Sequence, residues 1–220
     1  MKYRIRNLSE TRRLARKLIE EAGDKPIIIV SNHLTLIDSW IITWSLFDIK
    51  RFVSQFKVFP WNVPEIRNFG RNIPLRLMCY LGKCVYVERQ GRSKSRTLTM
   101  NKLKFLLSQG QSLCIFPEGG RSRIGRIDLD ATTYGVGSLI RENPECTILA
   151  TYCRGESQKE YSNFPKHGEE FQIMFEELSI PGFSCEGKRY DKEVSLYIMQ
   201  KLKEMEEQYF SHRERHRRFA

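Results

Sequence analysis

A run of four β-branched residues, Ile27–Val30, ends abruptly in Ser31-Asn32-His33 and constrains the fold more than any other feature of the chain. Such a run, bounded by turn residues, is typical of a strand buried on both faces within a parallel sheet. Ser31 and Asn32 end the strand, because both favour turns and local backbone hydrogen bonds. His33 is therefore expected at the carboxyl end of a strand, where open α/β sheets place their ligand crevices.

Asp38 follows His33 by five positions, a spacing that joins the two side chains only where the backbone changes direction. Neighbours on one helix face are three or four residues apart. We expect His33 in a loop and a helix beginning near Thr35, with Asp38 in its first turn. From there the carboxylate can bind one ring nitrogen and fix the tautomer, which leaves the other nitrogen free to act as a base. The alternative is a turn histidine beside a helix-capping aspartate.

The apolar segment 81–89 is a second candidate strand, introduced by Gly82 and closed by Arg89. A short apolar run with such boundaries favours a buried strand. Arg89, like His33, is then expected at a strand end, where it can face the same crevice and hold an anion.

A third predicted strand, residues 113–116, runs into the turn Pro-Glu-Gly-Gly-Arg-Ser-Arg. Gly119 and Gly120 allow the backbone to approach a ligand closely and to turn its N–H groups toward an anion. Arg121 adds a planar fork of donors suited to phosphate oxygens. Glu118 can accept from a substrate hydroxyl or hold an arginine in place. A plain surface turn is the alternative.

The remaining hydrophobic periodicity predicts one α/β domain: a mostly parallel central sheet flanked by helices, with an amphipathic helix at the N-terminus. Helices are expected over Leu8–Ala22, 39–47, 96–109, 132–142 and 191–210, and strands over 147–152 and 171–175. At 220 residues the chain is long enough for one substantial core. We divide it into a basic N-terminal helix, 1–24, and a main domain, 25–220.

The N-terminal helix Leu8–Ala22 carries leucines at helical spacing together with four cationic residues, Arg12, Arg13, Arg16 and Lys17. A basic amphipathic helix can lie in a membrane interface. The alternative is an ordinary surface helix packed on the domain.

Aromatic and basic residues alternate in the proline-broken segment 51–64. Such a segment could line an acyl-chain channel, sit at a membrane interface or stack on single-stranded nucleic acid. Packing in the core is the simplest alternative for any one of these aromatic side chains.

Charge and cysteine content narrow the class of protein. Lys and Arg number 37 against 26 Asp and Glu, a net charge of +11 that favours an anionic partner: a membrane surface, nucleic acid or a phosphorylated substrate. The six cysteines form no CxxC pair and are interpreted as reduced thiols of a cytoplasmic protein. The longest nearly apolar stretch, residues 34–47, is shorter than the roughly 20 residues that a bilayer span needs.

Three blocks of this sequence occur in the order and rough spacing of a known family: His33 with Asp38, residues 82–89, and the Phe-Pro-Glu-Gly-Gly-Arg-Ser run at 116–122. They resemble the glycerolipid acyltransferases, the group typified by 1-acylglycerol-3-phosphate acyltransferase. The resemblance covers about residues 25–155. The His-x4-Asp pattern alone is a weak signal, whereas its combination with the Phe-Pro-Glu-Gly block after a strand is a strong one.

The resemblance implies that His33 is a general base for the acceptor hydroxyl and that Asp38 orients it. The substrate-binding positions that it implies are Arg89, Glu118, Gly119, Gly120 and Arg121. Glu118 and Gly119 would belong to the acceptor pocket, and the two arginines would bind the acceptor's phosphate or another anionic head.

The resemblance also implies the partners. The donor would be a thioester of coenzyme A or acyl carrier protein, and the acceptor a lysophospholipid-like hydroxyl. No metal or other cofactor and no nucleic acid would take part. Main domain 25–220 would be the acyltransferase domain, attached peripherally to a membrane from the cytoplasm.

Two positions depart from the family pattern. Gly120 stands where the family usually has Thr, and residues 148–152 lack the Pro of its fourth block. The acceptor therefore stays open, and a non-glycerolipid hydroxyl or an amine is an alternative. A non-enzymatic basic module that binds RNA or membrane explains the charge, but it gives no reason for His33, Asp38 and Glu118 at strand ends.

Overall fold

The computed structural model describes residues 2–47, 56, 59–70, 72–91 and 93–218, without the side chains of 216–218. Its six-stranded sheet has the order β1-β6-β5-β2-β4-β3, and all neighbouring strands are parallel except the β5–β6 pair. The strands are β1 (Arg4–Ile5), β2 (Ile27–Ser31), β3 (Trp61–Asn62), β4 (Leu113–Ile115), β5 (Thr147–Gly155) and β6 (Glu170–Leu178). This arrangement confirms the predicted single α/β domain with a mostly parallel sheet.

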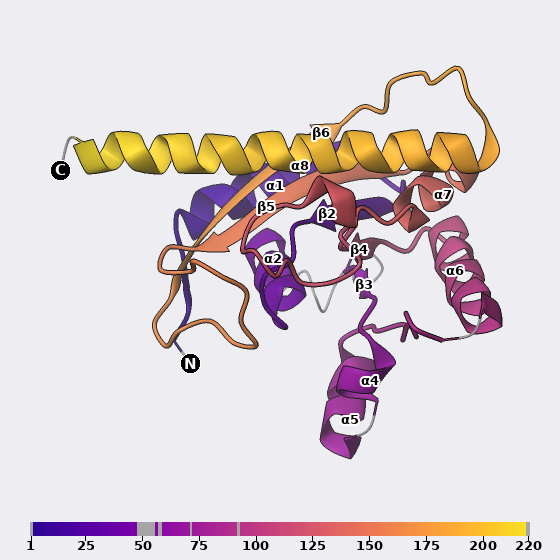
Figure 1. The fold of residues 1–220 in the computed structure, drawn as a ribbon, viewed down its shortest axis with the longest axis horizontal. Helices are drawn as coiled ribbons and strands as arrows, with labels where there is room; N and C mark the ends of the chain where they lie inside the picture. Colours follow the sequence, from indigo (N-terminus) through magenta and orange to yellow (C-terminus); the bar gives the residue numbers. More distant parts are fainter. Residues whose placement is uncertain (1, 48–55, 57–58, 71, 92, 219–220) are drawn as a thin grey trace.

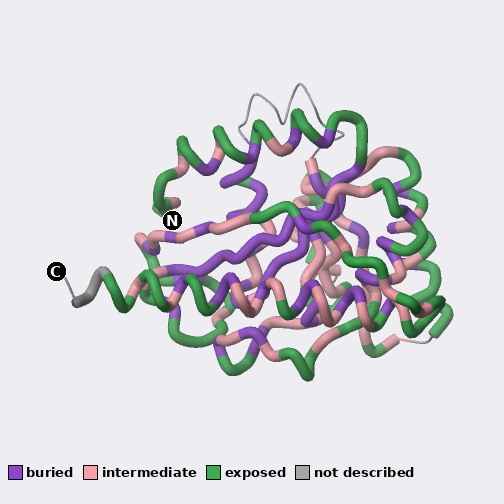
Figure 2. Tube along the Cα trace, turned by 90° about the horizontal axis from the view of Figure 1, so that it is seen from above, coloured by how far each residue is buried: buried purple, intermediate pink, exposed green. Residues whose placement is uncertain are grey.

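Helices cover both faces of the sheet (Figures 1 and 2). The helices are α1 (Leu8–Ala22), α2 (Asp38–Leu46), α4 (Ile66–Phe69), α5 (Ile73–Leu81), α6 (Ser93–Ser108), α7 (Gly135–Glu142), α8 (Gly187–Arg218) and the 3₁₀ turn η1 (Leu129–Ala131). One apolar cluster joins α1 and α2 to one face of the sheet, and a second joins α6, α7 and α8 to the other face. None of the helices in the described part of the chain has both the length and the apolar composition needed to cross a bilayer.

Strand β2 lies in the middle of the sheet, between the helices on its two faces. All five of its residues are buried, and it pairs in parallel with β4 on one side and β5 on the other. Its side chains alternate between the two apolar clusters, with Ile28 and Val30 in one and Ile27 and Ile29 in the other. The β-branched run is therefore hydrophobic throughout because both faces of its strand are covered.

Helix α1 packs on the domain as an ordinary surface helix. Ala15, Ile19 and Ala22 are buried in the cluster that contains Ile27 and Ile29 of β2. The apolar face of α1 is thus occupied by the sheet, which leaves its arginines on the solvent side. The helix begins after Asn7 and ends before Gly23, which are the predicted bounds.

The prediction of a strand over 81–89 is wrong. Leu81 is the last residue of α5, and Lys83 has a left-handed backbone with φ of 50°. Only Cys84 and Val87 form bridges, to Asn62 and Glu65. The apolar run has no long strand beside it with which to pair, because β3 at this edge of the sheet has only two residues.

Candidate active site

The carboxyl end of β2 brings His33 and Asp38 together as predicted. The chain leaves the sheet at Ser31, and Asp38 is the first residue of α2. His33 Nδ1 lies 3.0 Å from Asp38 Oδ2. The structure gives the other ring nitrogen, Nε2, no hydrogen-bond partner in the described part of the chain. The imidazole therefore has one nitrogen held and one available, the arrangement that a general base needs.

Asp38 is fixed from several directions. Its Oδ2 accepts from the backbone N–H groups of Leu34 at 2.6 Å and Thr35 at 2.7 Å, and its Oδ1 accepts from the Thr35 hydroxyl. Only 2% of the Asp38 side chain is exposed, against 13% for His33. These contacts orient the carboxylate toward the ring before any substrate binds, while part of the ring stays accessible.

The turn after β4 forms the opposite wall of this corner. The Phe116 ring stacks on the His33 imidazole, with ring centroids 4.0 Å apart and planes inclined by 14°. His33 N–H donates to Glu118 Oε1 at 3.1 Å, and Ser122 N–H donates to the His33 carbonyl at 2.8 Å. Three contacts thus hold the predicted base against the Phe-Pro-Glu-Gly-Gly-Arg-Ser turn.

Glu118 borders a cavity of about 520 Å³, a volume within the usual range of ligand pockets. The cavity lies between β4, α6 and α7, and its lining is mostly apolar. Glu118 Oε2 is buried and has no hydrogen-bond partner among the residues that the structure describes. Burial raises the pKa of Glu118 to about 8, against the opposing effect of the hydrogen bond from His33. At neutral pH the carboxyl group is therefore mainly protonated and can donate a hydrogen bond into the cavity.

The two predicted arginines occupy different surroundings. Arg89 lines the cavity, and its Nε lies 3.7 Å from Glu65 Oε2. Burial lowers the pKa of Arg89 from its ordinary value, with Glu65 opposing that shift. Arg121 Nη1 instead donates to the Ser162 carbonyl at 3.0 Å and to Asn163 Oδ1 at 2.7 Å. The cavity thus receives the side chain of Arg89, whereas Arg121 binds the loop before β6.

The two glycines of the turn also differ. Gly119 lines the cavity and has φ of +66°, and a Cβ added there would lie 2.5 Å from Thr133 Cγ2. Gly120 has no such restriction, since the nearest atom to an added Cβ is Arg89 Nη1 at 3.5 Å. Gly119 is therefore required by the turn itself, whereas Gly120 leaves space beside Arg89.

A model of the Acyltransferase family matches residues 3–154, more than half of the chain. The protein belongs to the Acyltransferase family. The match includes β2, β4 and every predicted site residue from His33 to Arg121, and it confirms the resemblance at the level of the family.

Among solved structures, the acyltransferase is similar to the 1-acyl-sn-glycerophosphate (LPA) acyltransferase PlsC from Thermotoga maritima. The two share 16% identity with a TM-score of 0.48, over 89% of this chain and 79% of that one. The search of curated proteins finds no match.

Three further residues of the candidate site were not predicted from the sequence. Thr35 binds Asp38, Phe116 stacks on His33, and Arg96 lines the cavity from α6. A hydroxyl residue three positions before the aspartate in a turn is a local signal for Thr35. The other two contacts join distant segments, so no spacing in the sequence indicates them.

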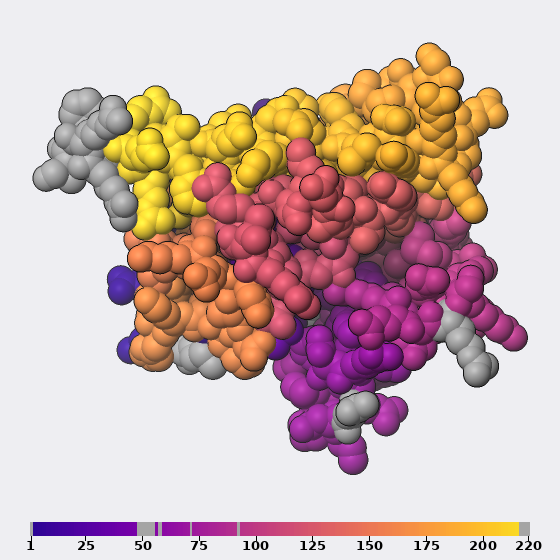
Figure 3. All heavy atoms as spheres, viewed as in Figure 1, coloured from indigo at the N-terminus to yellow at the C-terminus, as the bar shows by residue number. Residues whose placement is uncertain are grey.

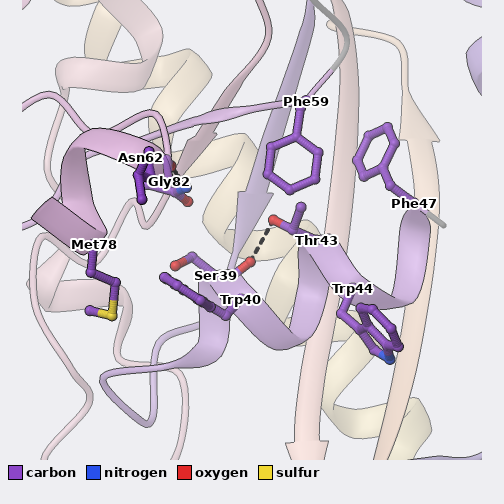
Figure 4. A pocket seen from close by; sticks show the side chains of 10 residues that line it. Ser39, Trp40, Thr43, Trp44, Phe47, Phe59, Asn62, Met78 and Gly82 are labelled. Atoms are coloured by element: carbon purple, nitrogen blue, oxygen red, sulfur yellow. Dashed lines mark hydrogen bonds between the residues drawn. The ribbon is translucent and has the colours of Figure 1, made fainter. Parts of the chain in front are cut away.

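The acyltransferase has a second, apolar cavity of about 360 Å³ between α2 and α5 (Figure 4). Trp40 and Trp44 of α2 and Met78 and Leu81 of α5 line it, and Phe59 lies at one end. Phe59 belongs to the aromatic segment 51–64; Phe52 of that segment lies outside the described residues. None of the described residues that line it is charged, in contrast to the cavity beside Glu118.

Proposed function

We propose that this acyltransferase moves a fatty acyl group from a thioester of coenzyme A or acyl carrier protein to the hydroxyl of a lysophospholipid-like acceptor. The observation that carries the proposal is the His33 ring, bonded to Asp38 through Nδ1, while none of the described residues bonds Nε2. This ring lies against the turn that borders the 520 Å³ cavity. A base beside a largely apolar cavity with cationic residues suits a lipid acceptor that carries an anionic head.

In the proposed mechanism, His33 Nε2 removes the proton of the acceptor hydroxyl as its oxygen attacks the thioester carbonyl. The new C–O bond gives a tetrahedral intermediate, and Asp38 stabilises the imidazolium that has formed. Collapse of the intermediate breaks the C–S bond, and the imidazolium returns its proton to the departing sulfur. The products are the ester and the free thiol, and His33 is neutral again.

The acceptor site is proposed to be the cavity lined by Arg89, Arg96 and Glu118. The two arginines would bind the anionic head, since guanidinium groups match phosphate geometry. The unpaired Oε2 of Glu118 supports a hydrogen bond to a polar group of the ligand. Met100, Leu103 and the other apolar lining residues would contact the hydrocarbon chain.

A different acceptor hydroxyl or an amine is the second candidate, and Gly120 is the observation that favours it. The family usually has Thr at this position, whereas here a Cβ is absent beside Arg89. Gly120→Thr adds a side chain beside Arg89, and it is therefore expected to shift the preference toward acceptors with a smaller anionic head group.

The test is thiol release from a long-chain acyl-CoA or acyl carrier protein in the presence of a panel of acceptors. We expect release that depends on an added lysolipid and yields an acylated product, with little release in its absence. His33→Ala is the matched control and should remove the acceptor-dependent part. Release only with amines or non-lipid hydroxyls would establish the second candidate. A failure of every acceptor, with either donor, would instead favour a non-enzymatic basic module.

A further inference from the structure

Large apolar side chains are exposed on α5 to an unusual degree. Ile73, Leu77 and Leu81 follow one another at four-residue spacing, so they form a single stripe along the helix. Their exposures are 78%, 59% and 62%, and that of Tyr80 beside them is 82%. Surface apolar residues are normal when scattered, but a contiguous group of this kind marks an interaction site.

Helix α2 extends this stripe into a surface. Trp40 and Trp44 are about half exposed, and they share the walls of the apolar 360 Å³ cavity with Met78 and Leu81 (Figure 4). Because several of these wall residues are themselves exposed, the cavity opens on the same side as the α5 stripe. We call this surface the α2–α5 face, defined by Trp40, Trp44, Ile73, Leu77, Tyr80 and Leu81.

The α5 part of the α2–α5 face lies on a projecting part of the molecule, whereas α2 is packed on the sheet. Helices α4 and α5 follow β3, the strand at one edge of the sheet, and extend away from the domain (Figure 1). The space-filling view shows the same segment as a protrusion at the lower edge, remote from α8 (Figure 3). A projecting apolar surface can reach a flat partner without a clash from the rest of the domain.

The charges around this face are cationic. Between Glu65 and Glu88 the sequence contains four Lys and Arg and no Asp or Glu, and of these four Lys83 is buried. Arg67 and Arg76 are exposed on α4 and α5. Arg12 of α1 lies over the Trp44 ring, 4.9 Å from its centroid, and donates to the Trp44 carbonyl at 2.9 Å. Tryptophan and tyrosine with flanking arginines, and no acidic residue in that segment, suit an interface with anionic headgroups.

We propose that the α2–α5 face docks this protein on a bilayer that contains anionic phospholipids. The inference deepens the proposed function by naming the surface through which the enzyme would meet a membrane. A second copy of the chain fits less well, because a symmetric pairing of this face would place the arginines of two copies against one another. Helix α1 is the weaker candidate, since Ala15, Ile19 and Ala22 are packed on the sheet and Leu14 is its one exposed large apolar residue, at 42%.

The test is co-sedimentation of the full chain with vesicles of phosphatidylglycerol mixed with phosphatidylcholine, and with vesicles of phosphatidylcholine alone. The double variant Leu77→Glu/Tyr80→Glu places two carboxylates on the face. Leu98→Glu is the matched control, because Leu98 is an equally exposed leucine, at 61%, on helix α6. Leu14→Glu on α1 tests the alternative anchor.

We expect the wild type, Leu98→Glu and Leu14→Glu to sediment with the anionic vesicles and to bind neutral vesicles more weakly. The double variant should bind at least about tenfold more weakly, since about two buried apolar side chains are lost. Equal binding by the double variant, or no binding by the wild type, overturns the proposal. A concentration-dependent dimer in the wild type that the double variant abolishes also overturns it, in favour of a second copy.

The vesicle experiment can fail or succeed independently of the activity test for the proposed function. Vesicle binding requires no substrate, and acyl transfer to a short-chain, water-soluble acceptor requires no membrane. The double variant should keep wild-type turnover on the soluble acceptor. Binding without turnover in the wild type would retain the docking face and remove the proposed activity.

Discussion

The two strand ends that build the site differ in how completely their polar groups are satisfied. At the end of β2, both carboxylate oxygens of Asp38 accept hydrogen bonds, and one nitrogen of His33 is held. At the end of β4, Glu118 has one oxygen bonded and the other buried without a partner. At the same turn, a Cβ added at Gly120 would lie at ordinary contact distance from Arg89 Nη1.

This difference indicates that the ends of β2 and β4 have different roles. The groups at the end of β2 are already oriented, so they need little reorganisation when charge develops in the transition state. This suits the chemical step. A buried oxygen beside a cavity can accept or share a hydrogen bond with a ligand, which suits recognition. Changes at the β2 end should therefore act on kcat, and changes at the β4 turn on KM, acceptor preference or stability.

Asp38→Asn should have the largest effect on turnover. The amide keeps the shape of the side chain but favours the wrong histidine tautomer, and a loss of about four powers of ten in kcat is expected from the behaviour of Ser-His-Asp enzymes. Steady-state kinetics with near-saturating acceptor measures it, with circular dichroism as the folding control. A change confined to KM would erase the distinction between the two strand ends.

Glu118→Gln should change how stability depends on pH. The pKa of Glu118 is raised from 4.5 to about 8 by burial. Folding therefore favours the protonated form, and its contribution is fully present below about pH 4.5 and is lost as pH rises through about 8. Over this window the wild type should lose on the order of 5 kcal/mol relative to the glutamine variant.

Denaturant unfolding of both proteins at a series of pH values measures this difference, because titrations of all other groups are common to the pair. Parallel stability curves for the two proteins would show that the Glu118 carboxyl group is ionised in the fold.

Arg89→Ala should raise the KM for a phosphate-bearing acceptor by about tenfold or more, because a charge-assisted contact in the cavity is removed. Arg121→Ala is the matched comparison, since the Arg121 guanidinium is already bonded to Ser162 and Asn163. Its effect on KM should be below about threefold. Equal effects from the two arginines would show that the loop before β6 also contacts the acceptor.

Gly119→Ala and Gly120→Ala should differ in stability by a smaller amount. Alanine at 119 takes a positive φ and meets Thr133, which costs about 1–3 kcal/mol. Alanine at 120 meets only Arg89 Nη1 at an ordinary contact distance, and its cost should be below ~0.5 kcal/mol. Thermal unfolding of the two variants checks the order, and equal costs would contradict the turn geometry.

The β2 corner could be predicted from the sequence because its signals are local. Four β-branched residues, a polar break and a five-residue spacing lie within a dozen positions, and the structure places the strand, the loop and Asp38 accordingly. The predicted first turn begins slightly later than expected, at Asp38 itself.

The segment 81–89 could not be predicted in the same way. Its valines have strand propensity, but a strand also needs a neighbouring strand with which to pair. Local composition does not indicate whether such a neighbour is present. The partner of Arg121 likewise comes from residues 162–163, about forty positions away. The cavity beside Glu118 is assembled from β4, α6 and α7, so its shape follows only from the packed fold.

The most direct test of the account is a double-mutant cycle on His33 and Asp38, measured as the single-turnover rate of acyl transfer. If the two residues act as one base, His33→Ala should remove most of the catalysis. The double variant His33→Ala/Asp38→Asn should then be no slower than His33→Ala alone, because the aspartate acts only through the ring. Losses that multiply in the double variant, or near-normal turnover by His33→Ala, would contradict the account.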